Sequence, residues 1–126
     1  MAYISFQPKD YFNCSIYTGN ETGRTITTGF EPTLVWTKCR NNAHHHIATD
    51  QVTGAGKRIR PNNNGAQDVS GASVASFIST GYTLTDNDTI NGNSQTNVSW
   101  SWKMNGAGSA DSSGSASNVT VSADAT

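Results

Sequence analysis

The apolar residues of this chain occur in short runs, several of which alternate with polar residues, and Gly, Asn, Pro or Asp closes each run. Period-two alternation is typical of half-buried strands, whereas an amphipathic helix repeats its apolar residues three and four positions apart over a longer stretch. The remaining sequence is rich in Ser, Thr, Asn and Gly, which favour turns and caps over helix interiors. The pattern therefore predicts an all-β fold, an antiparallel sandwich or barrel.

The same runs locate the expected strands. They cover residues 12–18, 24–28, 33–39, 45–50, 57–60, 74–78, 82–85 and 98–102. In the last run Val98, Trp100 and Trp102 alternate with serines, so their side chains share one face. We expect Trp100 and Trp102 to form the floor of the core, with Trp36 supplied by a neighbouring strand.

A length of 126 residues allows one domain with one core. We assign residues 1–104 to this β domain and residues 105–117, which are rich in Gly and Ser, to a flexible linker. Residues 118–126 resemble a strand again. We expect this tail to begin a further domain or to add a strand to a neighbouring subunit.

Net charge, hydropathy and the N-terminal residues limit the partners and the compartment that we expect for this chain. A formal net charge of -1 offers no basic face for a nucleic acid, and no stretch approaches the roughly 20 apolar residues of a membrane span. The first ten residues lack the pattern of a secretory signal, which predicts assembly in a cytoplasm. We accordingly expect Cys14 and Cys39 to be reduced thiols rather than a disulfide.

Few residues suggest chemistry, and we predict that the protein is not an enzyme, has no catalytic residues and carries no metal or cofactor. His44 and His46 would share a face of a strand, and with Cys39 or Asp50 they form an alternative zinc site. A pH-sensitive interface at these histidines is a second alternative.

Residues 86–93 resemble a calcium loop, but the glycine falls one place late and no Glu stands at the twelfth position. A looser calcium site of Asp86, Asp88 and Asn91 stays an alternative to a turn capped by its own side chains. A hydrolase acting on host polysaccharide would need paired carboxylates. Its candidates are Asp50, Asp68, Asp86 and Asp88.

Aromatic side chains supply a binding hypothesis. Trp36, Trp100, Trp102 and Tyr82 are candidates for stacking on sugar rings, a use of exposed aromatics in carbohydrate-binding surfaces. The competing interpretation places most of these side chains in the core, because so polar a domain has few other bulky residues to fill it.

Several separated motifs occur in an order that resembles a known family. They are DYFN at residues 10–13, YTGN at 17–20, GFEPTLVWTKCR at 29–40, GAGK at 54–57, GYTL at 81–84, NGN at 91–93 and VSWSWK at 98–103. Over residues 8–108 the chain resembles repeated β domains in fibre and other surface proteins of marine tailed-phage virions. It departs from them at residues 46–54, which read HIATDQVTG.

The resemblance implies a jelly-roll or concanavalin-like β-sandwich and a structural role in a virion. The implied function is a fibre or surface-appendage module that anchors or presents host-binding parts through self-association. The implied partners are other virion proteins and further copies of this chain, with a host surface glycan as an alternative ligand. A small capsid decoration or collar protein is a further alternative.

Overall fold

The computed structural model describes residues 7–69, 71–104, 109–111 and 119–121. It contains eleven strands with one short 3-10 helix, η1 (Pro8–Asp10), and one short α-helix, α1 (Asp88–Asn91). The strands are β1 (Phe12–Thr18), β2 (Arg24–Thr27), β3 (Leu34–Cys39), β4 (Ile47–Asp50), β5 (Lys57–Arg58), β6 (Asp68–Val69), β7 (Val74–Ile78), β8 (Gly81–Leu84), β9 (Thr96–Trp102), β10 (Ser109–Asp111) and β11 (Val119–Val121). Among the described residues, no helix has the length and apolar character needed to cross a bilayer.

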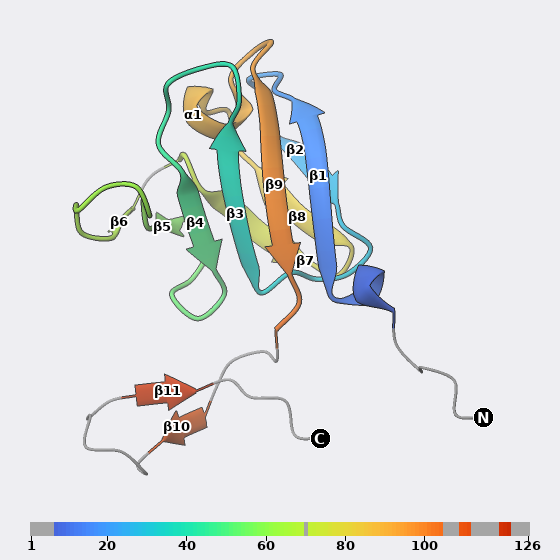
Figure 1. Cartoon of the computed structure of the whole chain (residues 1–126), viewed down its shortest axis with the longest axis vertical. Coiled ribbons are helices and arrows are strands. Elements are labelled where there is room, and N and C mark those ends of the chain that lie inside the picture. The colour runs from blue at the N-terminus through green and yellow to red at the C-terminus, as the bar shows by residue number, and fades with distance from the viewer. Residues whose placement is uncertain (1–6, 70, 105–108, 112–118, 122–126) are drawn as a thin grey trace.

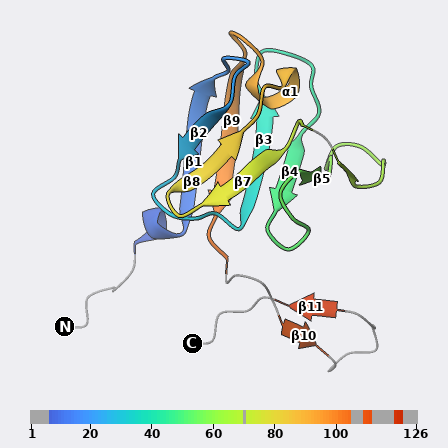
Figure 2. The ribbon, with the colours of Figure 1, turned by 180° about the vertical axis from the view of Figure 1, so that it is seen from behind.

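Two antiparallel sheets form the body of the domain. The larger has the strand order β1-β9-β3-β4, and the smaller has the order β2-β8-β7. Figure 1 shows the larger sheet in front, and Figure 2, from behind, shows the smaller sheet packed across its back. This arrangement confirms the predicted all-β, antiparallel sandwich.

Short pairings complete the topology. Strands β5 and β6 form a separate hairpin beside β4. Ile59, the residue after β5, forms an isolated β-bridge with Ala48 of β4. Strands β10 and β11 pair with each other, so three residues of the predicted linker and three of the predicted tail are strands. The rest of residues 105–117 and 118–126 lies outside the described residues, as does the N-terminal segment 1–6. The domain boundaries remain a prediction.

The core lies between the two sheets. Its buried apolar side chains are Tyr17, Ile26, Val35, Ile47, Val74, Tyr82, Leu84 and Ile90, and Phe77 packs against them from one side. These side chains come from all three strands of the smaller sheet, from the inward positions of β1, β3 and β4, and from α1. Burial of such side chains supplies the main driving force for folding.

The side chains at the centre of the larger sheet's inward face are small and polar. Burial alternates along β9, where Asn97, Ser99 and Ser101 are buried while Val98, Trp100 and Trp102 are partly exposed. Strand β3 alternates in the same way, with Thr37 inside and Trp36 outside. The expectation that the tryptophans form the floor of the core is therefore wrong, because the opposite face of β9 faces the second sheet.

Small residues at the centre of β9 leave room for a large side chain from the other sheet. Tyr82 on β8 is 0% exposed, and its hydroxyl donates a hydrogen bond to Ser99 Oγ over 2.7 Å. Close packing requires that the volumes of facing side chains complement each other. The tyrosine supplies the bulk that the serines lack, and the indole rings are left on the outside of the sandwich.

Candidate functional site

The outer face of the larger sheet carries an uninterrupted group of apolar side chains. Strands β1, β9, β3 and β4 place them there by period-two alternation. We call this surface the aromatic face. Its members are Phe12, Cys14, Ile16, Leu34, Trp36, Ala48, Val98, Trp100 and Trp102.

The strand register orders these residues into three rows across the sheet. Phe12, Trp102, Leu34 and Asp50 form the first row, and Cys14, Trp100, Trp36 and Ala48 form the middle row. The third row consists of Ile16, Val98 and Lys38. Directly opposed side chains on one face of antiparallel strands contact each other, so each row is a continuous strip. Charged residues occupy one end of each outer row, and the middle row has none.

Exposure on this face is unusually high for such side chains. Ile16 is 67% exposed and Phe12 is 38% exposed, and both lie on β1, the edge strand of the larger sheet that pairs with β9. The Phe12 ring packs against Trp102 with a centroid distance of 5.3 Å. Contiguous apolar surface of this kind on a soluble domain is typical of a place where another molecule binds.

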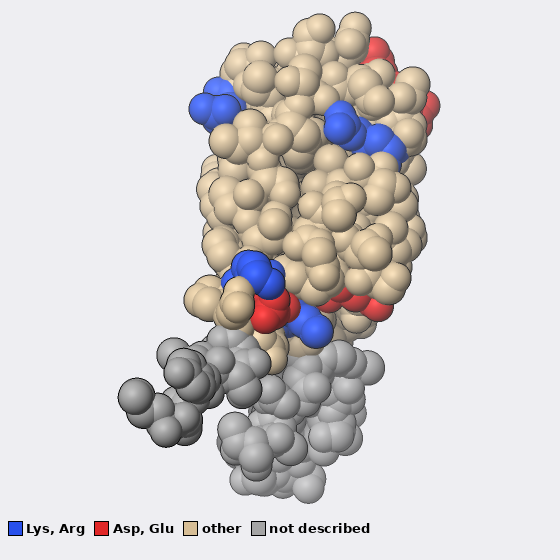
Figure 3. All heavy atoms as spheres, turned by 90° about the vertical axis from the view of Figure 1, so that its right-hand side faces the viewer, with Lys and Arg blue, Asp and Glu red and all other residues tan. Residues whose placement is uncertain are grey.

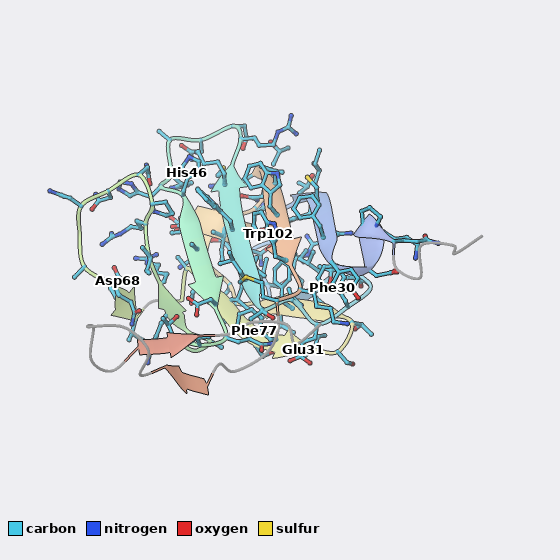
Figure 4. All side chains as sticks on the ribbon, turned by 60° about the horizontal axis from the view of Figure 1, so that its bottom comes forward. Phe30, Glu31, His46, Asp68, Phe77 and Trp102 are labelled. Atoms are coloured by element: carbon cyan, nitrogen blue, oxygen red, sulfur yellow. The ribbon has the colours of Figure 1, made fainter. Side chains whose placement is uncertain are left out.

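A hollow of about 300 Å³ lies on the aromatic face. Trp36, His46, Trp100 and Trp102 line it. Figure 4 shows Trp102 over the larger sheet and His46 near the start of β4, while Asp68 lies apart from both. Three indole rings and one imidazole thus border one shallow space.

His46 fixes one of these rings. The Trp36 Nε1–H donates to His46 Nδ1 over 3.0 Å, and the two rings meet edge to face with centroids 5.9 Å apart. Because Nδ1 accepts this bond, the neutral imidazole carries its proton on Nε2. The backbone N–H of His46 is held by Asn62 Oδ1 at 3.0 Å, so a loop residue positions the histidine and the histidine positions the indole.

The ammonium group of Lys38, at the end of the third row, is directed away from the apolar rows. Lys38 Nζ donates to the backbone carbonyl of Cys39, the last residue of β3, and to those of Asn42 and His44 in the loop that follows. These bonds order the loop that leads to the histidines. They also leave the aromatic face uncovered by the long lysine side chain, which elsewhere often shields apolar surface.

The structure brings together three of the four predicted sugar-binding residues. Trp36, Trp100 and Trp102 border the same hollow. Tyr82 does not join them, because it is fully buried in the core on the opposite side of the sheet. A tyrosine with no exposed surface cannot contact a ligand there, so Tyr82 is removed from the candidate site.

The alternative ion sites receive no support from the geometry. Asn91 is 0% exposed, and its side-chain amide bonds the backbone carbonyls of Thr22 and Thr85. Asn87 Oδ1 accepts the Thr89 N–H at 2.9 Å and caps α1, as expected for a turn that bonds its own backbone. Within the ranges that the structure describes, no group of three His, Cys, Asp or Glu is placed to hold a metal ion.

The two cysteines lie on opposite sides of the larger sheet. Cys14 is exposed on the aromatic face, whereas Cys39 is buried on the inward face, and both are free thiols. The alternation of β1 and β3 points their side chains to opposite faces, which excludes a bridge between them without backbone movement.

Sequence reasoning missed several members of the aromatic face. Phe12 and Ile16 were not recognised as candidates for the site, nor was His46 recognised as the partner of Trp36. One signal was present, since Lys38 and Trp36 are two residues apart on one strand. A lysine is almost never fully buried unless it is paired, so its presence on that face indicates that the face looks outward.

Comparison with known proteins places the chain in a family without describing its activity. No curated protein matches the chain significantly, and no solved structure does. A family model does match, over residues 7–126, which is nearly the whole chain. The chain belongs to the family described as a domain of unknown function, DUF7483.

Proposed function

We propose that this chain is a non-enzymatic structural module of a tailed-phage virion and that it attaches to a neighbouring protein through the aromatic face. The observation that carries the proposal is the inverted pattern of the larger sheet. Ser99 and Ser101 face the core while Trp100 and Trp102 face outward.

This inversion has an energetic consequence. Burying apolar surface contributes roughly 25 cal/mol per Å², so leaving indole and aliphatic side chains in water forgoes stabilisation that the fold could have used. Interfaces between proteins are enriched in aromatic side chains at their centres. The face has that composition, with Trp36 and Trp100 in its middle row and aliphatic Ile16 at its margin.

The polar groups beside the hollow are already bonded within the protein, which favours a protein partner over a small polar ligand. The Trp36 N–H already donates to His46, and Lys38 is engaged by backbone carbonyls. Small-molecule sites need polar groups that converge on the ligand to fix its orientation. Seen from the side of β1, the charged residues gather near the two ends of the domain, and a wide uncharged area lies between them, as Figure 3 shows. The virion setting rests on the resemblance of the ordered motifs over residues 8–108 to repeated domains of phage surface proteins.

Incorporation into particles tests the proposal. Tagged chains carrying Trp100→Ser or Val69→Ser would be produced during infection, and their amounts in purified particles would be compared with that of the unchanged chain. Val69 is the matched control because it is 80% exposed but lies on β6, outside the aromatic face. We expect the Trp100 variant to be depleted and the Val69 variant to be incorporated normally. Absence of the unchanged chain from the particles would refute a virion role.

Carbohydrate binding is the second candidate, and the hollow bordered by three indole rings favours it. Aromatic faces stack against the apolar faces of sugars, and His46 Nε2–H would donate to a hydroxyl. Binding on a glycan array that is lost in Trp36→Ala and Trp102→Ala, with folding unchanged, would establish this function. No binding by the folded monomer would exclude it for the glycans tested.

A further inference from the structure

We infer that Asn64 is a site of spontaneous covalent modification, at which the folded protein converts an asparagine into aspartate and isoaspartate. The inference goes beyond the proposed function, because it concerns the β5–β6 hairpin and not the aromatic face. An asparagine followed by glycine is especially prone to this reaction, since glycine has no side chain to hinder the approach of its backbone nitrogen. Within the residues that the structure describes, such pairs stand at 64–65 and 91–92.

The loop between β5 and β6 leaves Asn64 open to reaction. Residues 61–67 are all exposed and belong to no strand. Among the residues that the structure describes, no hydrogen bond restrains the Asn64 side chain. Exposed backbone without ladder hydrogen bonds rearranges at low free-energy cost. The side-chain carbonyl carbon of Asn64 and the backbone nitrogen of Gly65 are therefore free to approach each other.

Asn91 has the same following residue, but the fold holds it in place. Its side chain is 0% exposed, and Nδ2 donates to the backbone carbonyls of Thr22 and Thr85 at 2.7 and 2.9 Å. Its Oδ1 accepts the backbone N–H of Asn20 at 3.3 Å. Attack on this amide would leave buried polar groups without their partners, which is costly. The fold thus selects one of two pairs that are identical in sequence.

The reaction consumes water and releases ammonia. The Gly65 nitrogen forms a bond to the side-chain carbonyl carbon of Asn64, and the amide NH2 group leaves as ammonia with the proton of the Gly65 N–H. The product is a cyclic succinimide. Water then opens the ring at either carbonyl and gives aspartate or isoaspartate, so no oxidant or reductant takes part.

Asn63 restrains the first step. Its Oδ1 accepts the Gly65 N–H at 2.6 Å, and this bond must open before the nitrogen attacks. Asn63 is itself exposed, so water competes for the same N–H and the net strength of the bond is small. The hydrogen bond therefore slows the modification without preventing it.

The new charge arises close to a cation. A Cβ atom at Gly65 would lie 3.2 Å from Arg60 Nη2, so this guanidinium lies against the loop backbone one residue from Asn64. The same Nη2 lies 3.0 Å from Asp68 Oδ2. A carboxylate at residue 64 gives Arg60 a second anionic partner, and isoaspartate adds a methylene to the backbone. The modification therefore changes both the charge and the backbone length of the β5–β6 hairpin.

Incubation of the full chain in mildly alkaline buffer tests the inference. Peptide mass spectrometry with a fragmentation method that separates aspartate from isoaspartate measures the rate at each site. We expect Asn64 to react at least about tenfold faster than Asn91 in the folded chain, and the two to react at similar rates in urea. The pair at 105–106 lies outside the described residues and is measured on its own peptide.

Two variants sharpen the test. Asn64→Gln should remove the modification at this position, because the longer side chain would have to close a larger ring. Asn63→Ala should accelerate it, because the Gly65 N–H loses its partner. Equal rates at Asn64 and Asn91 in the folded chain would overturn the inference, as would an Asn64 that stays intact in the folded chain. A slower reaction in Asn63→Ala would show that the loop geometry, and not access to the Gly65 nitrogen, governs the rate, which also contradicts the account.

Discussion

The Tyr82 hydroxyl and Ser99 Oγ lie 2.7 Å apart in a hydrogen bond that joins the two sheets inside the core. This pair holds Ser99 on the inward face of β9, and strand alternation then leaves Trp100 on the outward face. A buried polar group stabilises the fold only when its partner is present, and the loss of one partner costs more than the loss of both.

Substitutions at this pair should therefore be non-additive. Ser99→Ala leaves the tyrosine hydroxyl buried without a partner and should lower the free energy of unfolding by about 1–3 kcal/mol. Tyr82→Phe should cost about 1 kcal/mol, and the double variant should cost less than the sum of the two. Urea unfolding of the four proteins measures the difference. Strict additivity would show that the two side chains do not interact.

Two buried phenols predict a loss of stability in alkali. Burial raises the pKa of Tyr17 and the pKa of Tyr82 above their ordinary value of 10.0. The unfolded chain ionises first as the pH rises past about 10, so the stability contributed by these groups is complete below that pH and declines above it. The unfolding free energy, followed from pH 8 to pH 11, should fall less steeply in Tyr17→Phe. An equal slope in both proteins would contradict the assignment.

Gly81 occupies a position with no room for a side chain. A Cβ atom there would overlap the backbone carbonyl oxygen of Ile26 on the paired strand β2. Gly81→Ala should destabilise the fold by at least about 2 kcal/mol through overpacking against the backbone. Gly23→Ala is the matched control, because its Cβ would meet the Leu84 carbonyl at an ordinary 3.7 Å. Thermal unfolding compares them, and equal melting temperatures would refute the close approach.

Asp68 joins the ends of the β5–β6 hairpin through two guanidinium groups. Its carboxylate lies 2.6 Å from Arg58 Nε and 3.0 Å from Arg60 Nη2. The hydrogen bond from Arg58 is the largest cause that lowers the pKa of Asp68 below its ordinary value of 3.8, and the charge of Arg60 adds to it. The basic residues of this segment are thus partly neutralised within the hairpin.

A titration distinguishes the two arginines. In a carboxyl-detected NMR titration, Arg58→Gln should raise the pKa of Asp68 more than Arg60→Gln does. Because the folded-state pKa is depressed, the stability from this group is present above pH 3.8 and is lost as the pH falls through the folded pKa. A larger shift in Arg60→Gln would reverse the order of the two contacts.

Much of the fold could be predicted from the sequence, and the main error has a physical cause. Period-two alternation located β1 and showed that Trp100 and Trp102 share a face. It cannot tell which face of a strand meets the core, since that depends on the volume supplied by the opposing sheet. Here Tyr82 supplies that volume, and no local pattern in β9 reveals it.

The candidate site was predictable only in part. The three tryptophans were recognised as candidates from residue type, and their meeting at one hollow depends on the pairing of β9 with β3, which brings distant segments together. The pairing of Trp36 with His46 depends on the path of the loop before β4. Such long-range contacts leave no periodic signal.

The central claim is that the aromatic face is covered by protein in the assembled particle, and a cryo-EM map of particles carrying this chain tests it most directly. The account predicts continuous protein density over Trp100 and Ile16, within contact distance of the outer face of β9. A well-resolved map in which these side chains face open solvent would contradict it.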